Sequence, residues 1–331
     1  MSAQEFAPDA VAASMSRGDG GFGREQSRYY DHPILRKPHW RWEIVWYFFI
    51  GGAAAASGAL SLLGERDPED AALVRNGRYT ALLGASLSGA LLIKDLGRPE
   101  RFLNMMRIVK LKSPMSVGVW SLMAFSAGGG LSALQQAKHD RIIGTNPLSW
   151  AGLLRRPLLA IGSLMMAGYT GVLLSATAIP VWFRGRRHLP AIFVLSATTT
   201  GCALQNALIA AGGGSARTQR KLELIETIAA LAEAALLLDY ERTTGETGKA
   251  LFGGARGARL RRWTLGIGIG IPALLTLPAL MGKDHGAKPH RLRPLVAAAC
   301  ALAGGYILRD AVVTAGRDSA DDARAYLRRP E

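Results

Sequence analysis

Apolar runs of about 20 residues recur along most of this 331-residue chain, and each is long enough to cross a lipid bilayer. In hydrocarbon every backbone N–H and C=O must find a partner within its own segment, so such runs fold as helices. The sequence therefore predicts an all-α integral membrane protein. Its eight transmembrane helices are expected at about 42–63, 78–96, 116–137, 158–183, 189–211, 222–240, 264–282 and 294–314.

Polar segments flank this predicted membrane domain of residues 41–315. Residues 1–40 are rich in Gly and Ser and predict a mobile N-terminal tail, and residues 316–331 predict a short charged C-terminal tail. The N-terminal segment has no apolar core of the kind found in a cleaved signal peptide. We expect the first span itself to direct insertion.

The net charge of +15 is carried by basic residues between the apolar runs. In a soluble protein such an excess suggests nucleic acid, but here anionic lipid headgroups and orientation signals explain it better. Lys and Arg are more numerous on the side that carries the termini, which predicts cytoplasmic termini in the inner membrane. A surface that docks an acidic partner would also be basic.

The predicted spans lack the residue patterns that bind haem, zinc or iron–sulfur clusters. No histidine lies within one, whereas a haem buried in the bilayer with two histidine ligands needs imidazoles there. The cysteines, Cys202 and Cys300, lie in apolar runs and lack the spacing of an iron–sulfur, zinc or disulfide site. We therefore expect no bound haem, metal or iron–sulfur cluster, so any redox chemistry would depend on a partner's electron carriers.

Charged residues gather where the second predicted span ends, in Lys94–Phe102. Charges at this density cannot lie unpaired in hydrocarbon, so they cap a helix end or line a site there. One hypothesis is a salt-bridged helix cap formed by Asp95, Arg98, Glu100 and Arg101. The other is a pocket for a quinone headgroup.

Aromatic and polar residues are expected near the same membrane face. Span 1 begins at His39–Glu43 and continues with Trp46 and Tyr47, and span 4 carries Tyr169 and Thr170. A belt of interfacial Trp and Tyr would explain the aromatic residues. A quinol gives up two protons with its two electrons, so its site needs hydrogen-bond donors, rings and a carboxylate or imidazole as proton acceptor.

The sixth predicted span is unusual because it carries carboxylates. Glu226 and Glu233 are two turns apart and share a helix face, and Glu223 lies one turn before Glu226. Carboxylates inside a span are costly and point into the bundle. They form either a proton route or structural hydrogen bonds made by protonated Glu.

Four motifs resemble the NrfD/PsrC family, the polysulfide-reductase-like membrane subunits. They lie in order on the ends of predicted spans, at Trp42–Gly52, Asp95–Met105, Ser113–Trp120 and Tyr169–Trp182. The resemblance implies two four-helix bundles, the first at about 42–183 and the second at about 189–314. It also implies a subunit without a cofactor of its own that exchanges quinol in the first bundle.

The same resemblance implies an iron–sulfur, ferredoxin-like partner subunit docked near the quinone site, with a molybdenum-type catalytic subunit completing the complex. The family's span-4 tyrosine best corresponds to Tyr169, and its polar groups near the start of span 1 fall among His39–Tyr47. Many family complexes dock their partner outside the cytoplasmic membrane, whereas the charge distribution here points inward. These two expectations disagree about orientation.

Together these arguments predict a quinone-reactive subunit of a respiratory oxidoreductase complex rather than a stand-alone enzyme. The alternatives are a proton- or solute-translocating protein and a structural membrane anchor. Four sets of residues carry the prediction: catalytic Tyr169, Glu43, Asp95 and Arg98; quinone-binding His39, Trp42, Tyr47 and Tyr169; partner-docking Arg98, Glu100 and Arg101; and proton-carrying Glu226 and Glu233.

Overall fold

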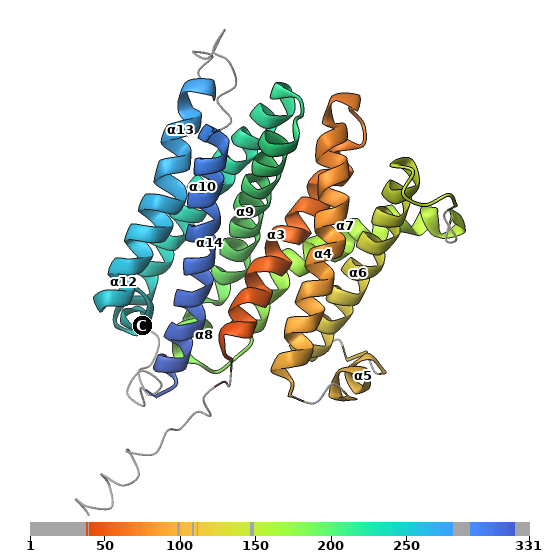
Figure 1. Ribbon diagram of the computed structural model, residues 1–331. Helices are drawn as coiled ribbons and strands as arrows, with labels where there is room; N and C mark the ends of the chain where they lie inside the picture. The colour runs from red at the N-terminus through yellow and green to blue at the C-terminus, as the bar shows by residue number, and fades with distance from the viewer. Residues whose placement is uncertain are drawn as a thin grey trace, which may run out of the picture.

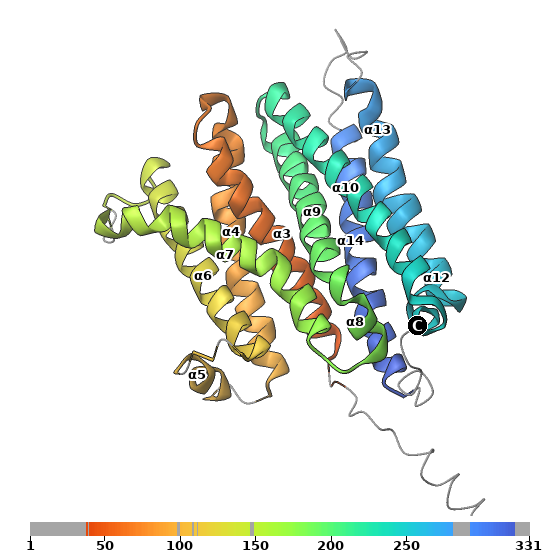
Figure 2. The ribbon, with the colours of Figure 1, turned by 180° about the vertical axis from the view of Figure 1, so that it is seen from behind.

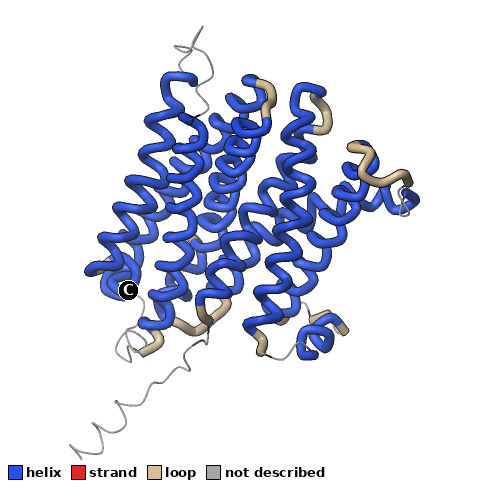
Figure 3. Tube along the Cα trace, in the orientation of Figure 1, coloured by secondary structure: helices blue, strands red, loops and turns tan. Residues whose placement is uncertain are grey.

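The computed structural model describes residues 38, 40–97, 100–107, 109–110, 112–145, 149–280 and 292–321. Within these ranges the secondary structure is entirely helical (Figures 1 and 3). The long helices are α3 (Trp42–Gly64), α4 (Ala71–Asp95), α6 (Pro114–His139), α7 (Gly152–Ser175), α9 (Leu189–Gly212), α10 (Ala216–Thr244) and α14 (Leu292–Ser319).

Short helices join or flank the long ones. They are η2 (Pro68–Asp70), α5 (Glu100–Met106), η3 (Ser149–Ala151), α8 (Pro180–Arg184), η4 (Gly185–Arg187), η5 (Gly245–Gly248), α11 (Lys249–Phe252) and α12 (Gly254–Leu260). A π-helix, η6 (Arg261–Gly270), continues directly into α13 (Ile271–Leu280).

Five of the described helices are long and apolar enough to cross a membrane: α3, α6, α7, α9 and α14. Helices α4 and α10 are comparably long but more polar, and in α10 the buried carboxylates contribute to this. The prediction of an all-α multi-pass membrane protein is confirmed. The exact number of eight spans stays a prediction.

Helix α3 lies at the centre of the molecule and packs against α4, α7, α9 and α14. Helices α4 and α6 lie on one side of it, and α10, α13 and α14 on the other (Figures 1 and 2). Small residues permit this close packing: a Cβ on Gly84 of α4 would lie 2.1 Å from the Cβ of Ala54 of α3. The division into two four-helix bundles stays a prediction.

The helix in the fourth predicted span, 158–183, ends before the predicted boundary. Helix α7 ends at Ser175, and Pro180 begins the separate helix α8. Trp182 lies in α8 and is fully buried. Its indole stacks on Trp40 at 5.2 Å and donates to the carbonyl of Val312 at 2.8 Å, because the break after α7 turns α8 toward α14.

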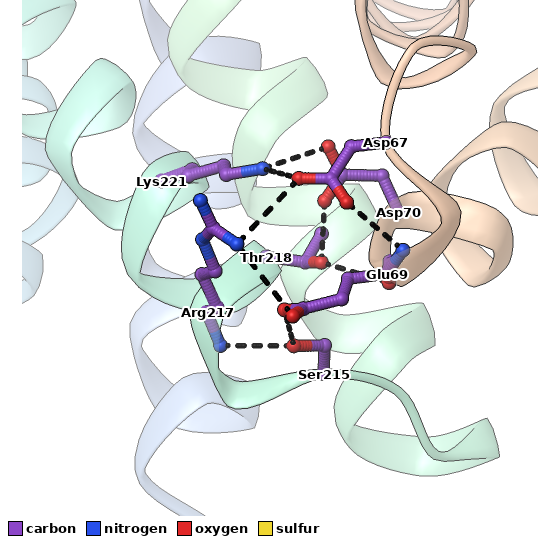
Figure 4. Close-up of polar contacts among 7 residues, drawn as sticks. All are labelled: Asp67, Glu69, Asp70, Ser215, Arg217, Thr218 and Lys221. Carbon is purple, nitrogen blue, oxygen red and sulfur yellow. Dashed lines mark hydrogen bonds and ion pairs between the residues drawn. The ribbon is translucent and has the colours of Figure 1, made fainter.

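At the end of α3 away from the N-terminus, the α3–α4 connection is tied to the first turns of α10 (Figure 4). Lys221 Nζ lies 2.8 Å from Asp67 Oδ2 and 3.0 Å from Asp70 Oδ2, and the Thr218 hydroxyl donates to Asp70 Oδ1 at 2.6 Å. Glu69, Ser215 and Arg217 complete this α3–α10 ion cluster. It joins helices that are far apart in the sequence.

Candidate functional site

Two buried polar side chains project from the first turns of α3. Glu43 and Tyr47 are four residues apart, so they share a helix face, and they are only 7% and 2% exposed. Glu43 Oε1 lies 3.7 Å from Lys94 Nζ at the end of α4. Its Oε2 is buried and has no hydrogen-bond partner among the residues that the structure describes. A buried carboxylate oxygen left in this state is suited to meet a ligand.

Tyr169 of α7 joins this pair. It is buried, and its hydroxyl interacts electrostatically with that of Tyr47. The ring packs directly on the backbone of α6, because a Cβ added to Gly118 would lie 1.9 Å from Tyr169 Cζ. Tyr169 therefore lies near Tyr47, which shares its helix face with Glu43; we call Glu43, Tyr47 and Tyr169 the α3–α7 cluster.

The other residues predicted at this end lie around the cluster or outside the described part. Asp95 is half-buried and interacts electrostatically with Glu43 and Arg41. Trp42 is 53% exposed, with Lys94 Nζ 4.3 Å from its ring centroid, so it faces outward as a residue of an interfacial belt would. Glu100 is exposed on α5. His39, Arg98 and the side chain of Arg101 lie outside the described residues.

A second group of buried carboxylates lies on α10 where it faces α9. Asn206 Nδ2 donates to Glu226 Oε2 at 3.2 Å, whereas Glu226 Oε1 is buried without a partner among the described residues. Glu233 shares hydrogen bonds with the hydroxyls of Ser196 and Thr199. The predicted common face of Glu226 and Glu233 thus points into the protein, where both are less than 5% exposed.

The sequence analysis missed Arg309, a buried arginine in the middle of α14. It is 1% exposed and donates to the Phe48 carbonyl from Nε, at 3.2 Å, and to Ser196 Oγ and the Gly305 carbonyl from Nη1. The guanidinium is close enough to the Glu233 carboxyl to act on it electrostatically. The signal was present, because Arg309 and Asp310 interrupt the last apolar run.

Arg309 also relates the two groups of polar residues to one another. The Phe48 carbonyl that it bonds directly follows Tyr47 of the α3–α7 cluster, and the Ser196 hydroxyl that it bonds also contacts Glu233. One guanidinium therefore lies between the candidate pocket and the carboxylates of α10.

A third polar group, at the other end of the helices, is structural. Glu65 accepts hydrogen bonds from Arg78, Arg155 and Arg156, and Arg78 also donates to Gln136. Burial by itself raises the pKa of the Glu65 carboxyl, but the bonds and charges of Arg155 and Arg78 outweigh it and lower the pKa to about 2. This ion pair network joins α3, α4, α6 and α7.

Among the described residues, no group of three His, Cys, Asp or Glu side chains is arranged to hold a metal ion. Cys202 is buried and Cys300 is half-buried, and both are free thiols. The polar groups described above can exchange hydrogen bonds and protons.

Comparison with known proteins identifies the family. A search among curated proteins finds no match. The family described as polysulphide reductase NrfD matches residues 35–317, a range that includes the α3–α7 cluster, both α10 carboxylates and Arg309. Because the match extends over most of the sequence and agrees with the all-helical fold, the chain belongs to the NrfD family.

Proposed function

We propose that this protein is the quinone-reactive membrane subunit of a respiratory oxidoreductase complex and relays electrons between the quinone pool and an iron–sulfur partner. NrfD-family proteins are membrane subunits of quinone-interacting oxidoreductase complexes. The observation that carries the proposal is the α3–α7 cluster, in which two buried phenols accompany a buried carboxylate whose Oε2 has no hydrogen-bond partner in the described part of the chain. A molybdenum-type catalytic subunit would complete the complex.

In this proposal the cluster handles the protons of the quinone headgroup. The Tyr169 and Tyr47 hydroxyls hydrogen-bond the ring oxygens, and Glu43 accepts a proton when a quinol is oxidised. Lys94, 3.7 Å from Glu43, stabilises the carboxylate before the proton arrives. Asp95, at the end of α4, would take the next proton toward the surface. The two electrons pass to the partner's clusters.

Tyr169→Phe tests the pocket. Loss of one hydrogen bond is worth roughly 0.5–1.5 kcal/mol, so quinol-linked turnover should fall by about 2- to 12-fold while the complex still assembles. Tyr79→Phe is the matched control, because it removes a hydroxyl bonded to Asp140 at the other end of α4. If Tyr169→Phe leaves the quinol kinetics as in the control, the quinone site lies elsewhere.

Docking of the partner is proposed at the same end, through Arg98, Glu100 and Arg101. Charge reversal by Glu100→Lys, on the exposed face of α5, should reduce the iron–sulfur subunit that co-purifies with the chain. Glu246→Lys, at an exposed position of η5 in the second half, provides the control. If both variants retain the partner, the docking surface does not include Glu100 of α5. Cytoplasmic termini in the inner membrane remain part of the proposal.

Proton translocation is a second candidate function, favoured by the burial of Glu226 and Glu233 on one face of α10. Glu226→Gln and Glu233→Gln keep the size of the side chain but remove its titration. Each should lower the number of protons taken up per quinol in proteoliposomes while quinone binding persists. Unchanged turnover and proton stoichiometry in both variants would make these carboxylates structural.

A further inference from the structure

A small cavity lies beside Glu233, between α9, α10, the π-helix η6 and α14. Its volume is about 10 Å³ for the centre of a water-sized sphere, which is room for about one water molecule. The lining is polar for a site so deep in a membrane domain, with the Glu233 carboxyl and the hydroxyls of Ser196, Thr199, Thr200 and Thr264. The approach of Gly268 to Gly304 closes one side, because a Cβ on Gly268 would lie 2.7 Å from Gly304 Cα.

The threonine hydroxyls of the cavity present acceptors rather than donors. Thr199 donates to the Leu195 carbonyl at 3.0 Å, Thr200 to the Ser196 carbonyl at 2.7 Å, and Thr264 to the Gly304 carbonyl at 3.1 Å. A hydroxyl has one hydrogen and two lone pairs, so each of these groups has only lone pairs left for the cavity. A carboxyl surrounded in this way is satisfied when it carries a hydrogen itself.

The contacts of Glu233 agree with a protonated carboxyl. Its hydrogen bond with Thr199 needs a hydrogen, and the Thr199 hydrogen is already directed at Leu195. Ser196 accepts from Arg309 Nη1 at 3.0 Å and keeps its own hydrogen for its hydrogen bond with Glu233. A protonated Glu233 can therefore accept from Ser196 and donate to Thr199.

Arg309 supplies the opposite charge that the ionised form would need. The guanidinium is held by the carbonyls of Phe48 and Gly305 and by Ser196, on three different helices. The charged group that faces Glu233 is therefore Arg309, from α14. Helix α9 and η6 face it with hydroxyls that do not titrate, and Glu226 lies two turns away on α10 itself.

We propose that Glu233 is the group that loads and releases the proton in the second candidate function, and that Arg309 is its positioning residue. On release, the O–H bond of Glu233 would break and a new O–H bond would form on a water molecule that enters the cavity and carries the proton away as hydronium. The Thr199 hydrogen then turns from the Leu195 carbonyl to the carboxylate, and Arg309 balances the new negative charge through Ser196.

Infrared spectroscopy of the intact complex in lipid nanodiscs tests this inference. The C=O stretch of a protonated carboxyl should be present at neutral pH, absent in Glu233→Gln, and lost as the pH rises. Arg309→Gln should move the midpoint of this loss to higher pH by a unit or more, because the charge that stabilises the carboxylate is gone. If Glu233→Gln removes no such band, Glu233 is ionised at rest and the inference is wrong.

A milder pair of variants guards against misfolding of Arg309→Gln. Thr199→Val should shift the frequency of the Glu233 band, whereas Thr198→Val should not, because Thr198 bonds the Val194 carbonyl and does not line the cavity. Identical spectra for the two variants would overturn the assigned hydrogen bond. A midpoint that moves when Na⁺ replaces K⁺ would show that the site takes a metal cation, which also contradicts the proposal.

This inference depends on the second candidate function for its physiological role, but its test does not. The infrared band reports protonation without quinol turnover. A band that titrates as expected while Glu233→Gln keeps full proton stoichiometry would support the protonation switch and reject proton translocation. If Glu233→Gln lowers the proton stoichiometry but the wild type shows no band from Glu233, proton translocation would be supported and the protonation switch rejected.

Discussion

At the scale of single residues, Gly118 determines whether the Tyr169 ring can occupy its place. A methyl group in Gly118→Ala would collide with the ring at 1.9 Å, so the ring must move or the helices must separate. We expect a loss of about 1–3 kcal/mol in stability and a loss of quinol-linked turnover.

Gly130→Ala is the control, because a Cβ at this position on the same helix has no neighbour within 4 Å. Thermal unfolding and turnover of the two variants separate a local collision from a general effect of alanine in α6. Full activity in Gly118→Ala would show that the position of Tyr169 is not critical for quinone chemistry.

The ion pairs of Glu65 lead us to expect that the stability of the fold depends on pH. Its pKa is lowered from 4.5 to about 2 in the folded state, so its contribution is present above about pH 4.5 and is lost as the pH falls toward 2. Thermal unfolding of wild type and Glu65→Gln should differ most above pH 4.5 and converge in acid. A constant difference across this range would contradict the assigned ion pairs with Arg78 and Arg155.

At the scale of elements, the α3–α10 ion cluster joins two helices that are not neighbours in the sequence. Asp70 is 5% exposed and contacts both Lys221 and the buried Thr218 hydroxyl (Figure 4). The Asp67 side chain is 27% exposed. Asp70→Ala should cost about 1–3 kcal/mol because it leaves a buried hydroxyl with a weaker partner. Asp67→Ala should cost less, since water replaces an exposed ion pair.

Chemical unfolding of these two variants checks this order. Equal losses would mean that burial of Asp70 does not matter. A larger loss for Asp67→Ala would assign the link between α3 and α10 to the exposed pair.

At the scale of the whole molecule, the positions of the six histidines predict a subunit without haem. They precede the first predicted span or lie in the connections, away from membrane depth. The isolated chain should therefore show no haem absorbance. A stoichiometric haem spectrum from the purified subunit would contradict this prediction, and the complex with the proposed iron–sulfur partner provides the positive control for iron analysis.

The sequence by itself determined the helical membrane fold, because runs of about 20 apolar residues have one solution in hydrocarbon. It also indicated the common face of Glu226 and Glu233, because the helical period depends only on spacing. It did not show that Trp182 is buried, that Gly118 accommodates Tyr169, or that Arg309 lies between Phe48 and Glu233. Those contacts join residues far apart in the chain, and only the packing of α3, α7, α9 and α14 decides which side chains meet.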